Sequence, residues 1–130
     1  MDALKIHMEK PLILIVEDDE KSRRLMKDVL EHQGYAVMET DQGEIGLALI
    51  RKCHPQLVLM DIHLPGISGL DAIREIRADA AIAATPVIAV TASVMGNVRE
   101  KIREAGFDGF EPKPLNLKAF LGTIRGLVPV

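Results

Sequence analysis

Short apolar runs alternate with longer segments of helical periodicity along the 130-residue chain, and this alternation limits the fold more than any other feature. A short, unbroken apolar run predicts a strand that is buried on both faces. Segments in which apolar residues recur every three or four positions predict amphipathic helices. Repeated strand–helix units require a parallel sheet with right-handed crossovers, so we predict an α/β fold.

Turn signals and helix caps divide the chain into five strand–helix units. Strands are predicted at 12–16, 36–39, 56–60, 86–90 and 109–111. Helices are predicted at 20–33 and 43–53, from Ser68 to about residue 78, from Val94 to Ala105, and from Asn116 onward. Five strands favour a flavodoxin-like, three-layer (βα)5 arrangement with the strand order 2-1-3-4-5. The third strand then lies at the centre of the sheet, between the first and the fourth.

Apolar residues at helical spacing should face the sheet. In the first three helices these are Leu25, Met26, Val29 and Leu30; Ile45, Ala48 and Leu49; and Leu70, Ile73 and Ile76. In the last two helices they are Val94, Val98, Ile102 and Ala105; and Leu117, Phe120, Leu121, Ile124 and Val128.

Composition and charge indicate one ordinary globular domain. The chain is 48% hydrophobic and 27% charged, and its length suits a single core. We assign residues 11–130 to this domain and residues 1–10 to a polar lead-in, in which Met8 offers an alternative start. The net charge of −3 and the lack of a basic run argue against direct binding to nucleic acid.

Cys53 is the only cysteine, so the sequence permits no internal disulfide and no cysteine-based metal cage. This usage suits a reducing compartment. The sequence has neither a secretion signal nor an apolar stretch of membrane-spanning length. We therefore expect a cytoplasmic protein without a membrane partner.

Polar side chains follow the predicted strands at what should be one edge of the sheet. Glu17 and Asp18 follow the first strand, Asp61 the third, Thr91 the fourth and Lys113 the fifth. Open α/β sheets bind their ligands at the carboxyl ends of the strands. Each residue alone has an ordinary explanation, such as a helix cap, a favourable charge at a helix N-terminus or a solvated lysine. Their joint placement at neighbouring strand ends favours a common site.

Three carboxylates at adjacent strand ends repel one another unless a cation lies among them. Oxygen ligands in a partly hydrated pocket suit Mg²⁺. We expect Asp18 and Asp61 to bind Mg²⁺ directly and Glu17 to bind it through water. The backbone carbonyl of His63 should complete the protein ligands.

With a metal screening its neighbours, Asp61 can attack a phosphoryl group and form an aspartyl phosphate. Lys113 would supply positive charge to a phosphate oxygen, and Thr91 would supply a hydroxyl donor. A phosphohistidine donor needs no general base, because no proton has to leave Asp61. The peptide bond before Pro114 can be cis, which would bend Lys113 over the site.

The chain resembles the receiver domains of bacterial two-component response regulators, the CheY-like family, from about Pro11 to Val128. The phrases that carry the resemblance are LILIVEDDE, LVLMDIHLPGISGLD, PVIAVTA and FEPKP, in this order, and the motifs are similar to those of single-domain, DivK-type receivers. The resemblance implies that a histidine kinase or a histidine phosphotransfer protein phosphorylates Asp61, with Mg²⁺ held by Glu17, Asp18 and Asp61. It implies a signalling switch whose only catalysis is its own phosphorylation and dephosphorylation.

The resemblance also implies a conformational switch. In the family, phosphorylation draws the hydroxyl of the residue at Thr91 inward, and the aromatic side chain, here Phe110, moves into the space that is left. Phe110 has no hydroxyl, so the hydrogen-bonded outward state of a tyrosine is absent. The fourth helix, fifth strand and fifth helix would then dock a downstream protein. Arg23 and Arg24 on the first helix are candidate contacts for the phosphodonor.

Three alternatives remain open from the sequence. A receiver fragment from a hybrid kinase or a multidomain regulator would carry the same motifs. A metal-dependent phosphatase of the haloacid-dehalogenase type also uses an Asp nucleophile, but it needs a second Asp where this chain has His63. A flavin-binding protein needs a phosphate-cradling loop after the first strand, where Glu17, Asp18 and Asp19 would repel a phosphate.

Overall fold

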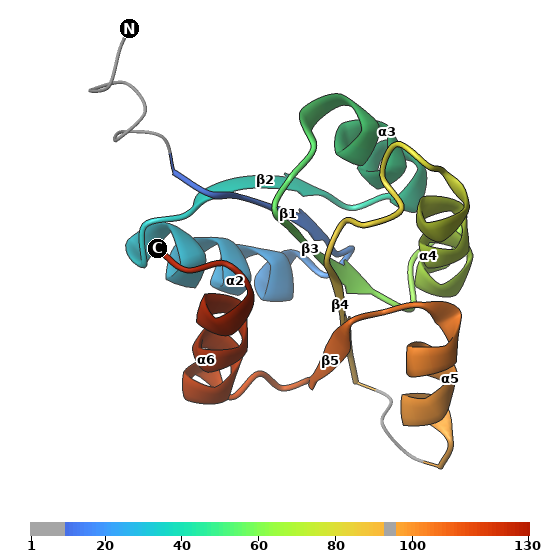
Figure 1. Cartoon of the computed structure of the whole chain (residues 1–130). Helices are drawn as coiled ribbons and strands as arrows, with labels where there is room; N and C mark the ends of the chain where they lie inside the picture. Colours follow the sequence, from blue (N-terminus) through green and yellow to red (C-terminus); the bar gives the residue numbers. More distant parts are fainter. Residues whose placement is uncertain (1–9, 93–95) are drawn as a thin grey trace, which may run out of the picture.

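A computed structural model describes residues 10–92 and 96–130 of the chain. In these residues, five parallel strands form one sheet in the order β2-β1-β3-β4-β5, and helices cover both of its faces (Figure 1). The predicted flavodoxin-like α/β fold and its strand order are therefore confirmed. The predictions for the lead-in at residues 1–9 and for Val94 lie outside the described residues. Among the described residues, no helix is long and apolar enough to span a membrane.

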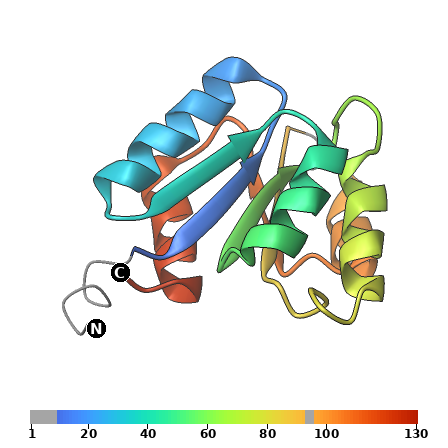
Figure 2. The ribbon, with the colours of Figure 1, turned by 90° about the horizontal axis from the view of Figure 1, so that it is seen from above.

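The described residues contain every predicted element, and the bounds match the prediction or shift by one residue, except that α5 begins at Val98. The strands are β1 Leu12–Val16, β2 Ala36–Thr40, β3 Leu57–Asp61, β4 Val87–Thr91 and β5 Gly109–Pro112. The helices are α2 Glu20–His32, α3 Gly43–Cys53, α4 Gly69–Ala78, α5 Val98–Ala105 and α6 Leu117–Leu127. Figure 2 shows α2 and α6 on one side of the sheet and α3, α4 and α5 on the other.

Local signals in the sequence set the helix ends. The side chains of Asp19, Ser68 and Asn116 each accept a backbone N–H from the first turn of the following helix, at 2.9–3.1 Å. Gly106 ends α5 in the left-handed conformation, with a φ of 114°, which a glycine adopts without strain. These ends fix where each strand meets its helix, and therefore where the loops of the site begin.

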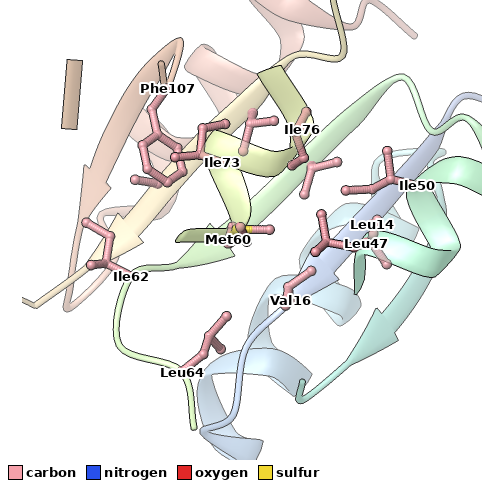
Figure 3. Packing of buried hydrophobic residues seen from close by; sticks show 14 of the residues in the cluster. Leu14, Val16, Leu47, Ile50, Met60, Ile62, Leu64, Ile73, Ile76 and Phe107 are labelled. Carbon is pink, nitrogen blue, oxygen red and sulfur yellow. The ribbon is translucent and has the colours of Figure 1, made fainter. Parts of the chain in front are cut away.

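The sheet separates two apolar clusters. Figure 3 shows the first, in which Leu14, Val16 and Met60 of the sheet pack against residues of α3 and α4, among them Leu47 and Ile73. The second lies under α2 and α6 and includes Tyr35, Met26, Leu30, Phe120 and Ile124. Each fully buried aliphatic side chain contributes about 1.5–3 kcal/mol, so burial on both faces holds the strand ends in fixed positions.

The inward face of α3 differs from the prediction. Ile45 is 44% exposed and Ala48 is also exposed, whereas Gly46 and Leu47 face the sheet. A Cβ at Gly46 would lie 2.9 Å from a methyl carbon of Val16, so this helix approaches β1 at its glycine. Close packing therefore selects the smallest residue for the inward face, and the larger Ile45 is turned outward.

The apolar stripes of α2 and α6 are narrower than predicted. Met26 and Leu30 are buried in α2, and Phe120 and Ile124 in α6, each pair four residues apart. Leu25, predicted to face the sheet, is 42% exposed, and Leu117, also predicted inward, is 40% exposed. One i, i+4 pair per helix fills the space over the sheet, and apolar residues beside the pair are left at the surface.

Candidate functional site

The carboxyl ends of four strands bring the predicted site residues together. Glu17 follows β1, Asp61 ends β3, Thr91 ends β4 and Lys113 follows β5. The backbone N–H of Lys113 donates to the Thr91 carbonyl at 2.9 Å, and that of Glu17 donates to the Thr40 carbonyl at 3.0 Å. These bonds extend the ladder beyond the strands, so the side chains leave the sheet from defined positions.

Three carboxylates form a compact group at this edge. Glu17, Asp18 and Asp61 each offer an oxygen atom, and these atoms lie within 4.8 Å of one another. Glu17 is fully buried and Asp61 is 6% exposed, while Asp18 is open to solvent. A hard oxygen donor set with one side open to water fits Mg²⁺, which keeps part of its hydration shell. Within residues 10–92 and 96–130, no other acidic, histidine or cysteine side chains are grouped in this way.

Lys113 is the cation that faces this group. Its Nζ lies 2.5 Å from Glu17 Oε1 and 3.1 Å from Asp61 Oδ2. Burial alone would lower the pKa of Lys113, but the contacts with Glu17 and Asp61 outweigh burial and raise it, so the side chain stays protonated. The Lys113–Pro114 peptide bond is cis, the isomer that the sequence allowed.

The surroundings of Glu17 favour the protonated form of its carboxyl group. Burial raises its pKa to about 7, against the opposing effects of Lys113 and of the Asp19 N–H, and the neighbouring Asp61 adds to the rise. The Asp19 N–H donates to Glu17 Oε2 at 3.0 Å. A carboxyl group held in this way gains stabilisation from any further cation at the site.

The loop after β3 begins with a turn at Asp61. Asp61 Oδ1 accepts the backbone N–H of His63 at 2.9 Å, and the His63 side chain points into solvent. At the end of this loop, a Cβ on Gly69 would lie 2.4 Å from the Asp61 carbonyl oxygen, so only glycine fits there. The first turn of α4 is therefore packed directly against the end of β3, and the loop is short and tightly folded.

The predicted switch residues lie on the α3–α4–α5 side of the sheet. Thr91 is fully buried at the end of β4, next to a cavity of about 190 Å³ whose lining includes Val98 and Ile102. Phe110 on β5 is half-buried, and the guanidinium carbon of Arg99 lies 5.0 Å from the centre of its ring. Thr91 and Phe110 belong to neighbouring strands, β4 and β5, which pair in parallel.

Arg23 has a role that the sequence did not indicate. Its side chain donates to the Glu17 carbonyl at 2.9 Å and to Glu39 Oε1 at 3.1 Å, so it ties the loop after β1 to the end of β2. Arg24 points outward and pairs with Glu20 on the same helix. Only Arg24 of this pair therefore projects from the surface, because the side chain of Arg23 is 19% exposed.

The parallel sheet carries an acidic group, a threonine and a lysine at its carboxyl edge, and the comparisons with known proteins show the family to which the chain belongs. The response regulator receiver domain model matches residues 13–125. The chain therefore belongs to the receiver domains of two-component response regulators, which are signalling switches rather than enzymes in the usual sense.

Among its relatives, the polar-differentiation response regulator DivK of Brucella ovis is 40% identical over 113 residues, which cover 87% of this chain and 92% of DivK. The receiver domain of the sensor histidine kinase PA1611 of Pseudomonas aeruginosa, with a magnesium ion coordinated in its active-site cleft, has a TM-score of 0.86 and 27% identity over 94% of this chain and all of that domain. CheY4 of Vibrio cholerae has the same fold, with a TM-score of 0.85 and 22% identity over 92% of this chain and all of CheY4.

Proposed function

We propose that residues 11–130 form a phosphorylation-dependent signalling switch in which Asp61 accepts a phosphoryl group from a histidine kinase or a histidine phosphotransfer protein. The observation that carries this proposal is the placement of the Asp61 carboxylate. It is buried, lies 3.1 Å from the ammonium of Lys113, and shares its surroundings with Glu17 and Asp18. Phosphoryl transfer depends mainly on positioning and on neutralising charge, and these groups provide both.

In the proposed step, an Asp61 oxygen forms a bond to phosphorus while the bond from phosphorus to the donor imidazole nitrogen breaks. The nitrogen keeps the electron pair and takes a proton from solvent, and Asp61 has no proton to lose. Lys113 then pairs with a phosphate oxygen in place of Asp61, and the Thr91 hydroxyl donates to another oxygen.

Asp18, Asp61 and the His63 carbonyl would hold Mg²⁺ directly, and Glu17 would hold it through water. When bound, Mg²⁺ neutralises charge on the transferring group. The PA1611 receiver supports this assignment, because that related domain coordinates a magnesium ion in its active-site cleft. The general acid of a haloacid-dehalogenase-type phosphatase is not at its expected position, because His63 stands where such an enzyme would carry a second Asp.

We propose that the phosphodonor docks over the start of α2 and the loop before α6, beside the acceptor. Leu25, 42% exposed, supplies an apolar contact, and Arg24 projects from the same helix. A mostly apolar groove of about 170 Å³ lies next to Lys113 and is lined by Lys21, Ser22, Leu25, Lys113, Pro114 and Leu115. A partner that buries Leu25 in contact with this groove would bring its histidine to the carboxylate group.

The face formed by α5, β5 and α6 would read the phosphorylated state. Movement of the Thr91 hydroxyl toward the phosphate would change the space beside the 190 Å³ cavity, and Phe110 on the neighbouring strand would respond. Because Arg99 lies against the Phe110 ring, a movement of Phe110 also changes the surface of α5. A downstream protein that contacts α5 and β5 together would distinguish the two states.

The decisive experiment is incubation with Mg²⁺ and acetyl phosphate, followed by intact mass measurement. We expect a phosphate-sized mass gain that is stable in acid and labile in base. Asp61→Ala should abolish it, and Asp18→Ala should leave little. Asp71→Ala is the matched control, because Asp71 is an exposed acid of α4 outside the carboxylate group. An adduct that persists in Asp61→Ala, or that maps to serine or histidine, would overturn the proposal.

A further inference from the structure

A side chain that the proposed chemistry does not use ties the loop between β3 and α4, residues 62–68, to a neighbouring helix. Glu44, in the first turn of α3, accepts the backbone N–H of Ile67 through its Oε1 at 2.9 Å. The two residues are 23 positions apart, so the bond joins two units of the fold. Glu44 is exposed and is not a member of the carboxylate group at the sheet edge.

Two glycines allow the helix and the loop to approach this closely. A Cβ at Gly43 would lie 2.6 Å from Ile67 Cγ2 and 2.9 Å from the Ile67 carbonyl oxygen. A Cβ at Gly66 would lie 2.9 Å from Glu44 Oε1, and Gly66 has a φ of 76°, which favours glycine. Glycine at positions 43 and 66 therefore leaves room for the contact between α3 and the loop.

The hydrogen bond from Glu44 differs in one respect from the bond at the start of the loop. The His63 N–H is held by Asp61 Oδ1 at 2.9 Å, and the Gly69 N–H is held by the Ile62 carbonyl at 2.9 Å. The first of these uses the carboxylate that would bind metal and accept the phosphoryl group, so it changes during the proposed reaction. The bond from Glu44 to Ile67 is independent of Asp61 and can hold the loop in every state.

We propose that Glu44 is a positioning residue for the metal site. By holding Ile67, it keeps the loop in the conformation in which the His63 carbonyl can serve as a ligand of Mg²⁺ beside Asp61. Glu44 touches neither the metal nor the phosphoryl group, and it acts only through the loop. Groups that orient metal ligands in this way commonly set metal affinity. The inference rests on the proposed function, because it assumes that Mg²⁺ binds at this edge.

Glu44 also has an ordinary alternative role, which the test must separate. An acid in the first turn of a helix interacts favourably with the helix dipole, and Gln42, the N-cap of α3, makes no side-chain capping bond. The dipole requires the negative charge of Glu44, whereas the loop requires only an oxygen acceptor. Glu44→Gln keeps the acceptor and removes the charge, and Glu44→Ala removes both.

The test compares Mg²⁺ titrations of the ¹⁵N-labelled full chain with hydrogen exchange of the Ile67 amide, both followed by NMR. Glu44→Ala should raise the Mg²⁺ dissociation constant by about tenfold and speed exchange at Ile67. Glu44→Gln should stay within about twofold of the wild type in both measurements. Glu100→Ala, which removes the first-turn acid of α5, should change neither. With acetyl phosphate, Glu44→Ala should need more Mg²⁺ to reach an unchanged maximal rate.

The outcomes separate this inference from the proposed function. An unchanged Mg²⁺ affinity in Glu44→Ala, or unchanged exchange at Ile67, would overturn the inference. Equal losses in Glu44→Gln and Glu44→Ala would assign the effect to charge and would also overturn it. In either case a wild-type protein that binds Mg²⁺ and gains phosphate leaves the proposed function intact. A wild-type protein that neither binds Mg²⁺ nor gains phosphate would contradict both the inference and the proposed function.

Discussion

Two clusters of partly buried charge in this protein are built in opposite ways. At the carboxyl edge of the sheet, one ammonium, that of Lys113, faces Glu17 and Asp61, with Asp18 close by. Near the other end of β4 and β5, the guanidinium of Arg77 is surrounded by acceptors. It donates at 2.6–2.9 Å to the carbonyls of Ala83, Thr85 and Gly106 and to the carboxylate of Asp108.

The charge of Arg77 is paired within its own cluster. At the sheet edge, by contrast, three carboxylates face the single ammonium of Lys113. Arg77 joins the last turn of α4, the segment before β4 and the turn before β5, and Asp108 also accepts the Val87 N–H at 2.7 Å. Such a network contributes to stability, because its partly buried polar groups are paired. The edge cluster leaves Glu17 with a pKa raised from 4.5 to about 7, so its ionisation lowers stability as the pH rises through this range. This contrast suggests that the edge is shaped for binding and the Arg77 cluster for folding.

The substitution Asp61→Asn is the strongest test of this contrast between the two clusters. We expect phosphoryl transfer from acetyl phosphate to fall by at least about a thousandfold, because the nucleophile is gone. At the same time the free energy of unfolding should rise by about 1 kcal/mol, because one of the crowded like charges is removed. Asparagine can still accept the His63 N–H. Mass spectrometry and urea unfolding measure the two effects, and a loss of stability would contradict the contrast.

Arg77→Met should have the reverse pattern. We expect the free energy of unfolding to fall by about 3 kcal/mol, because three partly buried carbonyls lose their donor at once. The Mg²⁺ affinity of the folded variant should stay within about twofold of the wild type. Arg74→Met is the control: Arg74 is 67% exposed and pairs with Asp71 at the surface, so its loss should change stability by less than about 0.5 kcal/mol. Equal losses of unfolding free energy in Arg77→Met and Arg74→Met would contradict a structural role of Arg77.

The sequence predicted the strand order and the residues at the strand ends, because both follow from local patterns. Periodicity locates each element, and parallel strands bring their carboxyl ends to one edge. The sequence did not reveal the ties made by Arg23, Glu44 and Arg77. Each of these looks like a solvated charge on a helix, and no local pattern marks a partner that is distant in the chain.

The helix faces show a second limit. Ile45 is larger and more apolar than Gly46, so the helical spacing of apolar residues predicted that Ile45 faces the sheet. The close approach of α3 to β1 leaves room only for the glycine. No helix or strand was predicted between about residue 78 and the strand at 86–90, yet this segment buries Ile82, which is 2% exposed. The side chain of Arg77 donates to the carbonyls of the neighbouring Ala83 and Thr85, a side-chain contact that periodicity does not reveal.

Mg²⁺ should convert the sheet-edge cluster from a destabilising into a stabilising element. At ten times its dissociation constant, Mg²⁺ should raise the free energy of unfolding by about 1.4 kcal/mol. The effect should disappear on chelation and in Asp18→Asn, which removes a proposed ligand. Arg77→Met should keep it, because that cluster holds no metal. Urea unfolding with and without Mg²⁺ measures these differences, and a gain in Asp18→Asn as large as in the wild type would remove Asp18 from the ligand set.

Glu111 offers the smallest effect and tests whether an unsatisfied carboxyl lowers stability away from the site. It is 9% exposed on β5, and burial raises its pKa above the ordinary 4.5, an effect that the Thr123 hydroxyl partly offsets. The folded state therefore favours the protonated form, so stability falls as the pH rises from 4.5 through the raised pKa. Glu111→Gln should be more stable than the wild type by about 1 kcal/mol at pH 8 and equal to it near pH 4. The exposed Glu75→Gln should show no such pH dependence. If the stability difference between Glu111→Gln and the wild type is the same at both pH values, the ionisation of Glu111 does not cause that difference.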